Sequence, residues 1–315
     1  MTYTLSMPTT KKLTYGVEVE CAELSAESPR LEEQFSFTRH FDRTIRGPNG
    51  EELPRDTASE LISKVLTISA TVPDSTTPAR LNGETPSSNP FQRLQVAYDG
   101  SEDVVKGLCG CLGKVNKSCG IHIHIGNPRR TPRKSEWSAE EIQTWLTVCS
   151  LLEERLFAIV PASRLNNQYC KKISESYTPS DFKNNCPIGP VVSRKYSNPK
   201  RYCWLNLIET KRRGTTEVPG RSESEGLGTV EIRMLGNTKR FEYIWAWTRL
   251  WIKIGTIIAF YPPSQAIMSL CISDLLDADF MEIKRIKELP ENRRTNAPAP
   301  TVSNIRPNIR RADGN

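Results

Sequence analysis

Three short segments of this chain alternate strictly between apolar and polar residues, and they constrain the fold more than any other feature. The segments are GVEVE, GIHIHIG and TVEIRM, which begin at Gly16, Gly120 and Thr229. Because a strand turns successive side chains to opposite faces, each segment has one apolar face and one polar face. A solvated sheet would explain any one of them. Their polar residues are glutamate, histidine and arginine, however, and three such strands together favour a functional site.

Helices are predicted between these strands. The segment SEWSAEEIQTWLTVCSLLEERLFAIVP has a cap at Ser135 or Ser138, acids in its first turn and apolar residues at helical spacing. A second helix, apolar almost all round, is predicted over about Tyr243 to Phe260, and a third around Asp103 to Leu112. Strands spread along the chain with helices inserted between them predict an α+β domain built on an antiparallel sheet.

Charge is distributed unevenly along the 315 residues, whose formal net charge is +7. From Lys284 onward, eight basic and three acidic residues give the tail +5, which leaves +2 on the preceding 283 residues. A nearly neutral body gives no basic face for nucleic acid, so nucleic-acid contact is expected only if the tail provides it. We predict an N-terminal arm over residues 1–13, one domain over 14–290 and a disordered basic tail over 291–315.

Neither a membrane span nor a secretory signal is expected. The most apolar stretch, Phe241 to Pro262, has Arg249 and Lys253 near its middle, where a bilayer would penalise each charge by roughly 2.5–3.5 kcal/mol. The nine cysteines lack paired spacing, which is typical of free thiols in a reducing cytoplasm. A structural zinc site in C-x-C-x7-C-x2-H, starting at Cys109, is an alternative, but its spacing matches no familiar finger or ribbon.

The polar faces contain the ligand types that suit a metal-bound phosphate. Carboxylates with an imidazole are suitable for a hard or borderline divalent cation such as Mg²⁺ or Mn²⁺. An arginine beside a carboxylate ligand can neutralise a phosphate bound to the same metal. Clustered acids would repel one another unless cations balanced their charge.

In their order along the chain, these segments resemble the motifs of the amidoligase family, part of the glutamine synthetase and glutamate–cysteine ligase superfamily. The matching stretches are YGVEVE, FDRTI, SELIS, CGIHIHIG, SRLNNQYC, RYCWLN and TVEIRMLGNT, which together cover roughly Thr14 to Thr238. Two positions depart from the pattern. Lys64 stands where the family usually has proline, so that TASELISKVL also fits a helix, and Thr229 stands where glutamine synthetases have arginine. The loop over residues 211–228 also looks long.

The resemblance implies a fold like the glutamine synthetase catalytic domain, with a curved, mainly antiparallel sheet and helices packed on one side. It implies that residues 14–290 form an ATP-dependent carboxylate–amine ligase, which uses Mg²⁺ or Mn²⁺ and makes an amide through an acyl phosphate. Its substrates would be small-molecule or peptide carboxylates and amines. A small-molecule or guanidino kinase of related fold and a non-catalytic nucleotide-binding protein are the alternatives, and the oligomeric state stays open.

The resemblance also implies metal ligands. One divalent ion would be held by Glu18, His122 and Glu231, and another by Glu20 and Glu60. Of these, Glu60 depends on whether its segment forms a strand.

The remaining implied roles concern phosphate and substrate. His124 and Arg233 would contact the phosphate being transferred. Arg164 and Asn206 would either bind substrate or tie loops to the sheet, and Asp42 would either deprotonate the amine or stabilise a turn. The residues expected to bind the ATP cofactor are Arg201, Arg164 and Asn206.

Overall fold

The computed structural model describes residues 9–47, 49–54, 57–72, 94–127, 137–178, 202–207, 228–236 and 238–289. Within these ranges, eight strands form one open sheet in the order β3-β4-β1-β8-β10-β9, with β5 joined to β1 and β6 to β5. All of its strand pairs are antiparallel. The strands are β1 (Thr9–Cys21), β3 (Thr38–Phe41), β4 (Ser59–Ile62), β5 (Leu66–Val72), β6 (Gln95–Ala97), β8 (Gly120–Gly126), β9 (Leu205–Asn206) and β10 (Thr229–Gly236).

The long strand β1 organises the sheet. Its first half pairs with β5 and its second half pairs with β4 along the same edge, while β8 takes the other edge. Between β4 and β5 the chain remains bonded to β1 through Ser63, whose Oγ accepts a hydrogen bond from the Val17 N–H at 3.0 Å. The segment that also fitted a helix is therefore strand, which places Glu60 beside β1. Residues 9–13, predicted as an N-terminal arm, are the first part of β1.

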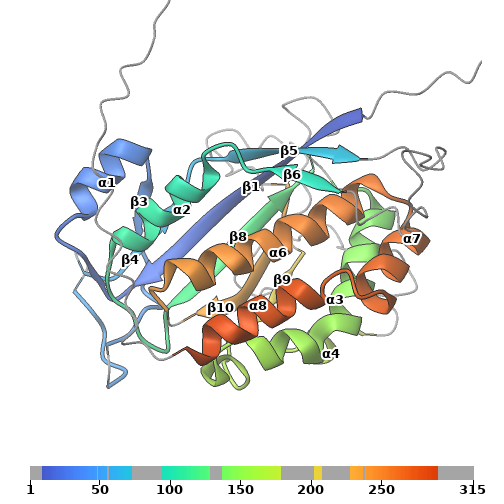
Figure 1. The fold of residues 1–315 in the computed structure, drawn as a ribbon. Coiled ribbons are helices and arrows are strands. Elements are labelled where there is room, and N and C mark those ends of the chain that lie inside the picture. Colours follow the sequence, from blue (N-terminus) through green and yellow to red (C-terminus); the bar gives the residue numbers. More distant parts are fainter. Residues whose placement is uncertain are drawn as a thin grey trace, which may run out of the picture.

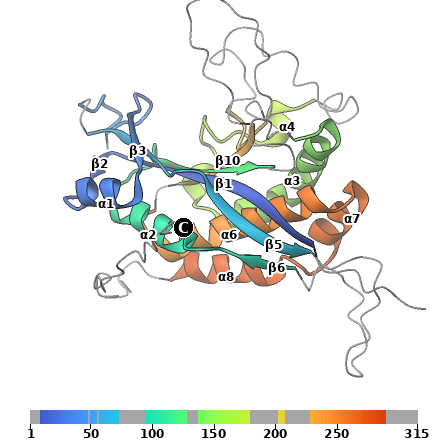
Figure 2. The same ribbon diagram turned by 90° about the horizontal axis from the view of Figure 1, so that it is seen from above.

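The main helices lie on one side of the sheet. Figure 1 shows α6 in front of the strands, and the turned view in Figure 2 shows α6 and α8 below them, with α2 on the same side. The helices are α1 (Ser28–Phe35), α2 (Ser101–Gly110), α3 (Ala139–Ile159), α4 (Ile173–Ser176), α6 (Phe241–Phe260), α7 (Pro263–Ile267) and α8 (Asp277–Glu288), with a 3-10 turn η2 (Ala162–Arg164) and a π-helical turn η6 (Met268–Ile272). A small second sheet pairs β2 (Glu23–Leu24) with β7 (Leu112–Lys114). The predicted α+β class and antiparallel sheet are confirmed, whereas the glutamine synthetase-like curvature stays a prediction.

Alternation along the strands builds the core. Every apolar residue of the GVEVE, GIHIHIG and TVEIRM segments is buried, and these residues face α6 and α3 across a cluster of indole rings. Trp251 of α6 is at the centre of that cluster, with its ring centroid 6.3 Å from Trp145, 5.9 Å from Trp204 and 5.6 Å from Trp247. Gly255 lets α6 approach the sheet, because a Cβ there would lie 2.7 Å from Cγ2 of Ile125.

The three predicted helices form, and the described residues contain four further helices, α1, α4, α7 and α8. Ser138 caps α3 through a reciprocal capping box with Glu141, as its sequence indicated. The two charges inside α6 are paired with α8, a helix that the sequence analysis did not predict: Arg249 Nη2 lies 2.8 Å from Glu282 Oε1, and Lys253 Nζ lies 2.7 Å from Asp279 Oδ2. No helix in the described ranges combines the length and apolarity needed to cross a bilayer.

Three predictions lie largely or wholly outside the described residues: Arg201, the long loop over 211–228, and the tail over 291–315. The eight cysteines that the structure does describe are all free, and seven of them are buried.

Candidate active site

The pairing register places polar residues from four strands side by side on the face opposite the helices. Directly opposed side chains on neighbouring strands lie about 4.5–5.5 Å apart at Cβ, so residues distant in sequence meet here. The opposed pairs are Glu18 with His122, Glu20 with Glu60, and Glu231 with His124. The polar faces predicted for the three alternating strands therefore form one surface, to which β4 adds Glu60.

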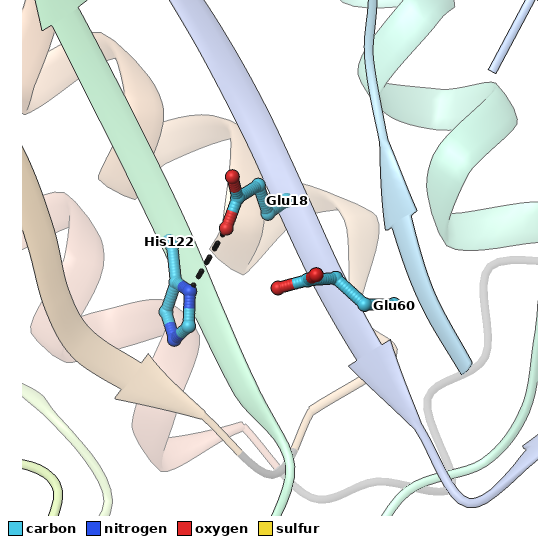
Figure 3. Close-up of side chains that lie close together, drawn as sticks. All are labelled: Glu18, Glu60 and His122. Carbon is cyan, nitrogen blue, oxygen red and sulfur yellow. Dashed lines mark hydrogen bonds and ion pairs between the residues drawn. The ribbon is translucent and has the colours of Figure 1, made fainter. Parts of the chain in front are cut away.

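His122 lies among three carboxylates. Its Nδ1 is 3.1 Å from Glu18 Oε2 and 3.4 Å from Glu231 Oε1, and its Nε2 is 3.6 Å from Glu20 Oε1. Figure 3 shows the ring reaching Glu18 from the neighbouring strand, with Glu60 extending toward the same space from the other side of β1. Because His122 is only 3 % exposed, its imidazole is surrounded by these carboxylates and not by water.

His124 is held from two sides. Its Nε2 lies 3.0 Å from Glu18 Oε1, and its Nδ1 lies 3.0 Å from Thr229 Oγ1. Thr229 was expected on the polar face of its strand, at a position where glutamine synthetases have arginine, and no role was predicted for it. Its position two residues before Glu231, on the same polar face, was the signal that could have identified it as the partner of His124.

Glu231 connects β9 and β10 to the histidines. Its Oε2 accepts a hydrogen bond from Asn206 Nδ2 at 2.6 Å, and its Oε1 accepts one from Arg233 Nη1 at 3.1 Å. A guanidinium has five N–H donors, and in the described part of the chain Arg233 Nε has no hydrogen-bond partner. Arg233 thus keeps donors for an anion next to the carboxylates.

Arg164 and Asn206 both contact β10. Asn206 is bonded to Glu231 as described above. Arg164 is 2 % exposed and donates from Nη2 to the carbonyl oxygen of Arg233 at 2.7 Å and from Nε to that of Met234 at 3.2 Å. Both therefore support the strand that presents Glu231, and a direct contact of either with a cofactor stays a prediction.

Glu20, Asp42 and Glu60 form the other end of the polar surface. Glu20 Oε2 accepts a hydrogen bond from the backbone N–H of Gly120. Asp42 Oδ1 accepts bonds from the Thr44 N–H at 2.7 Å and the Thr44 hydroxyl at 2.8 Å, which is a turn-stabilising arrangement. Asp42 still offers an oxygen toward Glu20 and Glu60.

Three groups of side chains have the composition and spacing of a cation site, with ligand atoms within 4.8 Å of one another. Carboxylate oxygens with at most one imidazole nitrogen are a donor set that fits Mg²⁺ or Mn²⁺, and no cysteine belongs to any of the three. The groups are Glu18–Glu60–His122, Glu18–His124–Glu231 and Glu20–Asp42–Glu60. This grouping unites His124 with Glu231 and His122 with Glu60, whereas the resemblance implied His122 with Glu231. The assignment of particular ligands to particular ions stays a prediction.

The crowding of carboxylates contributes to a raised pKa of Glu60. Burial, and then the charges of Glu18, Glu20 and Asp42, raise the pKa of Glu60 to about 9. At neutral pH and without a cation, this side chain therefore holds a proton that a bound metal would have to displace.

Glu18 and Glu231 titrate in the opposite direction. Burial alone would raise the pKa of Glu18, but His124 and His122 outweigh it and hold that pKa well below its usual value. For Glu231, burial is likewise outweighed, mainly by Arg233 and then by the two histidines, so its pKa is lowered. These two carboxylates are therefore already ionised and available as ligands.

Comparison with known proteins identifies the family. The model of the family described as "Putative amidoligase enzyme" matches residues 96–254, from within β6 into α6. The match contains both histidines, Glu231 and Arg233, whereas Glu18, Glu20 and Glu60 precede it. Neither curated proteins nor solved structures gave a match. Because the family model covers half of the chain and contains β8 and β10, two of the four strands that form the site, the protein belongs to the amidoligase family.

Proposed function

We propose that this protein is an ATP-dependent carboxylate–amine ligase. The carboxylate of one substrate attacks the γ-phosphorus of ATP, the bond to the β-phosphate oxygen breaks, and ADP leaves. An amine then attacks the acyl carbon, the bond from that carbon to the phosphate oxygen breaks, inorganic phosphate leaves, and the nitrogen loses a proton to give the amide. Membership of the amidoligase family supports amide formation, and the polar surface of the sheet supports the phosphoryl-transfer step. The proposed substrates are small-molecule or peptide carboxylates and amines, and the proposed location is the cytoplasm.

The observation that supports this proposal best is the meeting of three candidate cation groups, which are linked because Glu18 belongs to two of them and Glu60 belongs to two. Phosphoryl transfer needs little covalent help from a protein and depends on positioning and on neutralising phosphate charge. Divalent ions bound in these groups would supply that neutralisation. The alternating acidic and imidazole side chains have the donor chemistry for such ions. The pKa of Glu60, raised first by burial and then by its acidic neighbours, indicates that this buried cluster does not keep all of its carboxylates charged without cations.

Arg233 is the residue that we propose for the transferred phosphate. One of its N–H groups is bonded to Glu231, while its remaining donors suit an oxyanion beside that carboxylate. His124 is directed to the same region by Thr229 and Glu18. The low exposure of these side chains also favours the reaction, because an acyl phosphate must be kept from water until the amine arrives.

Hydroxylamine trapping tests the proposal directly. The protein is incubated with ATP, Mg²⁺, hydroxylamine and a panel of amino-acid and peptide carboxylates, and both ADP and hydroxamate are measured. Because only an activated acyl group gives a hydroxamate, we expect both products to form in equal amounts with the correct carboxylate. ADP with a phosphorylated substrate but no hydroxamate would indicate a kinase. Nucleotide binding without ADP formation across the panel would indicate a non-catalytic protein.

A further inference from the structure

The strand that presents Arg233 is irregular at that residue. Along β10, Ile232 lies opposite Ile123 of β8, and the next matched pair is Leu235 with Ile121. Arg233 and Met234 therefore stand together where β8 supplies only His122. Such a bulge interrupts the hydrogen-bond ladder and changes the direction of the side chains around it. The direction of Arg233 thus depends on what holds the bulge.

Arg164 contacts this bulge through its guanidinium group. Nη2 and Nε donate to the carbonyl oxygens of the two bulged residues, Arg233 and Met234, at 2.7 and 3.2 Å. Nη1 lies against Gly236, where an added Cβ would be only 3.0 Å away. Two nitrogens of the guanidinium therefore bond the backbone of β10 and the third lies beside it, and only 2 % of the residue is exposed. A planar fork can bond two neighbouring carbonyls at fixed geometry, which a single ammonium cannot do.

The other side of the bulge is held by Trp204, the residue before β9. The backbone N–H of Arg233 donates to the carbonyl oxygen of Trp204 at 2.7 Å, and the N–H of Trp204 donates to that of Lys171 at 3.1 Å. Trp204 is itself anchored by its indole N–H to Glu153 of α3 at 2.7 Å. The backbone of Arg233 is thus held on both sides. Its N–H is bonded to Trp204, and its C=O is bonded to Arg164.

We propose that Arg164 is a positioning residue, which acts by holding the β10 bulge so that Arg233 is directed at the transferred phosphate. The inference rests on the proposed function. Of the two roles that the resemblance left open for Arg164, it favours tying a loop to the sheet over direct contact with substrate or cofactor, and it adds that this tie holds the β10 bulge.

The test is Arg164→Lys in the full-length protein, with two measurements. The first is hydrogen–deuterium exchange of peptides spanning residues 229–236, which does not depend on activity. The second is the rate of ATP-dependent product formation. The matched control is Arg155→Lys, because Arg155 is a partly exposed arginine of α3 that pairs with Asp277, away from the site. If Arg164→Lys does not fold, Arg164→Gln replaces it, since its amide donates to one carbonyl without burying an unpaired charge.

We expect Arg164→Lys to increase exchange in residues 229–236 and to lower turnover by about 10- to 100-fold, the usual cost of losing a group that orients a functional residue. The control should change neither. In combination with Arg233→Lys, the Arg164 substitution should add less than about a threefold further loss, because both act through one side chain.

Three results would overturn the inference: unchanged exchange in residues 229–236, full turnover despite increased exchange, or independent, multiplicative losses in the double variant. The failure of the proposed function gives a different result. If the unsubstituted protein forms no product with any carboxylate, the ligase assignment fails, and exchange alone then decides whether Arg164 holds the bulge.

Discussion

The two faces of the central sheet are built from the same strands, yet they are specified in different ways. On the apolar face, each of β1, β8 and β10 contributes several β-branched or aliphatic side chains, and helices cover them completely. On the polar face, a handful of carboxylates, two imidazoles and one guanidinium meet within a few ångströms. The apolar face is stabilised by many contacts that different apolar side chains could make, whereas each residue of the polar face has its own role.

This contrast separates stability from function. Burial of apolar area stabilises a fold regardless of which side chain supplies it. A cluster of like charges works against folding unless partners compensate, so the polar face is difficult to explain as a device for stability. The predictions below test whether stability and activity really divide between the two faces.

The largest effect is expected on the apolar face, from Trp251→Ala. Trp251 is completely buried among three other indoles, and truncating such a residue typically costs about 3–5 kcal/mol of unfolding free energy. Urea titration followed by tryptophan fluorescence and circular dichroism measures that cost. Trp251→Phe is the matched control and should cost less, because the indole N–H of Trp251 has no partner among the described residues. A loss from Trp251→Ala of under about 1 kcal/mol would contradict the view that these indoles form the core.

On the polar face, Glu18→Gln should lower turnover strongly and stability only slightly. Glu18 belongs to two of the three candidate cation groups, and loss of the charge stabilisation that a metal provides amounts to several kcal/mol, or about a 10³-fold loss of turnover. Stability should fall less than in Trp251→Ala, because glutamine fills the same space. Product formation and urea titration together measure this, with Glu154→Gln, an exposed glutamate of α3, as the control. Full turnover in Glu18→Gln would remove Glu18 from the site.

The sequence predicted some helices and strands better than others. Strand β8 matches its predicted segment because glycines bound a run of perfect alternation, and α3 begins at a serine with a matching glutamate. By contrast, β4 is short, and its letters fit a helix equally well. Only the ladder with β1 decides the matter, and periodicity within a segment gives no information about its partners. Helix α8 also escaped prediction, although it supplies the partners of Arg249 and Lys253.

For the site, the sequence identified the residues better than their relationships. It named both histidines, Glu18, Glu20 and Glu231 because their types stand out against apolar neighbours, whereas Glu60 and Asp42 were named only through the family resemblance. It gave no sign of the β10 bulge, since an extra residue in a strand becomes visible only when the opposing strand is known. The bonds of Arg164 to two carbonyls, and of Thr229 to His124, depend on that same pairing. Pairwise geometry was therefore the missing information.

A smaller effect is expected where backbone meets ligand groups, at Gly120. A Cβ there would lie 2.8 Å from His122 Nε2 and 3.1 Å from Glu20 Oε2, so Gly120→Ala must displace both side chains. We expect the affinity for Mg²⁺ or Mn²⁺ to fall by about 10- to 100-fold, as when other supporting contacts of a metal site are lost. Gly16→Ala is the matched control on the same polar face, because its added Cβ would be in ordinary contact, 3.8 Å from Ser63 Oγ. Equal affinities in the two variants, measured by calorimetry, would contradict the requirement for close approach.

The last effect concerns the proton on Glu60. Because its pKa is raised to about 9, Glu60 is protonated below that pH and must lose the proton to become a ligand. Cation affinity should therefore rise with pH, by up to about tenfold per unit between pH 7 and 9, and then level off. Glu18 and Glu231 contribute no such rise, because their lowered pKa values keep them ionised throughout. Calorimetry in two buffers of different ionisation enthalpy counts the released proton, and Glu60→Gln should abolish both its release and the pH dependence. If Glu60→Gln binds cations with an unchanged proton release, the displaced proton comes from another group and Glu60 is no ligand.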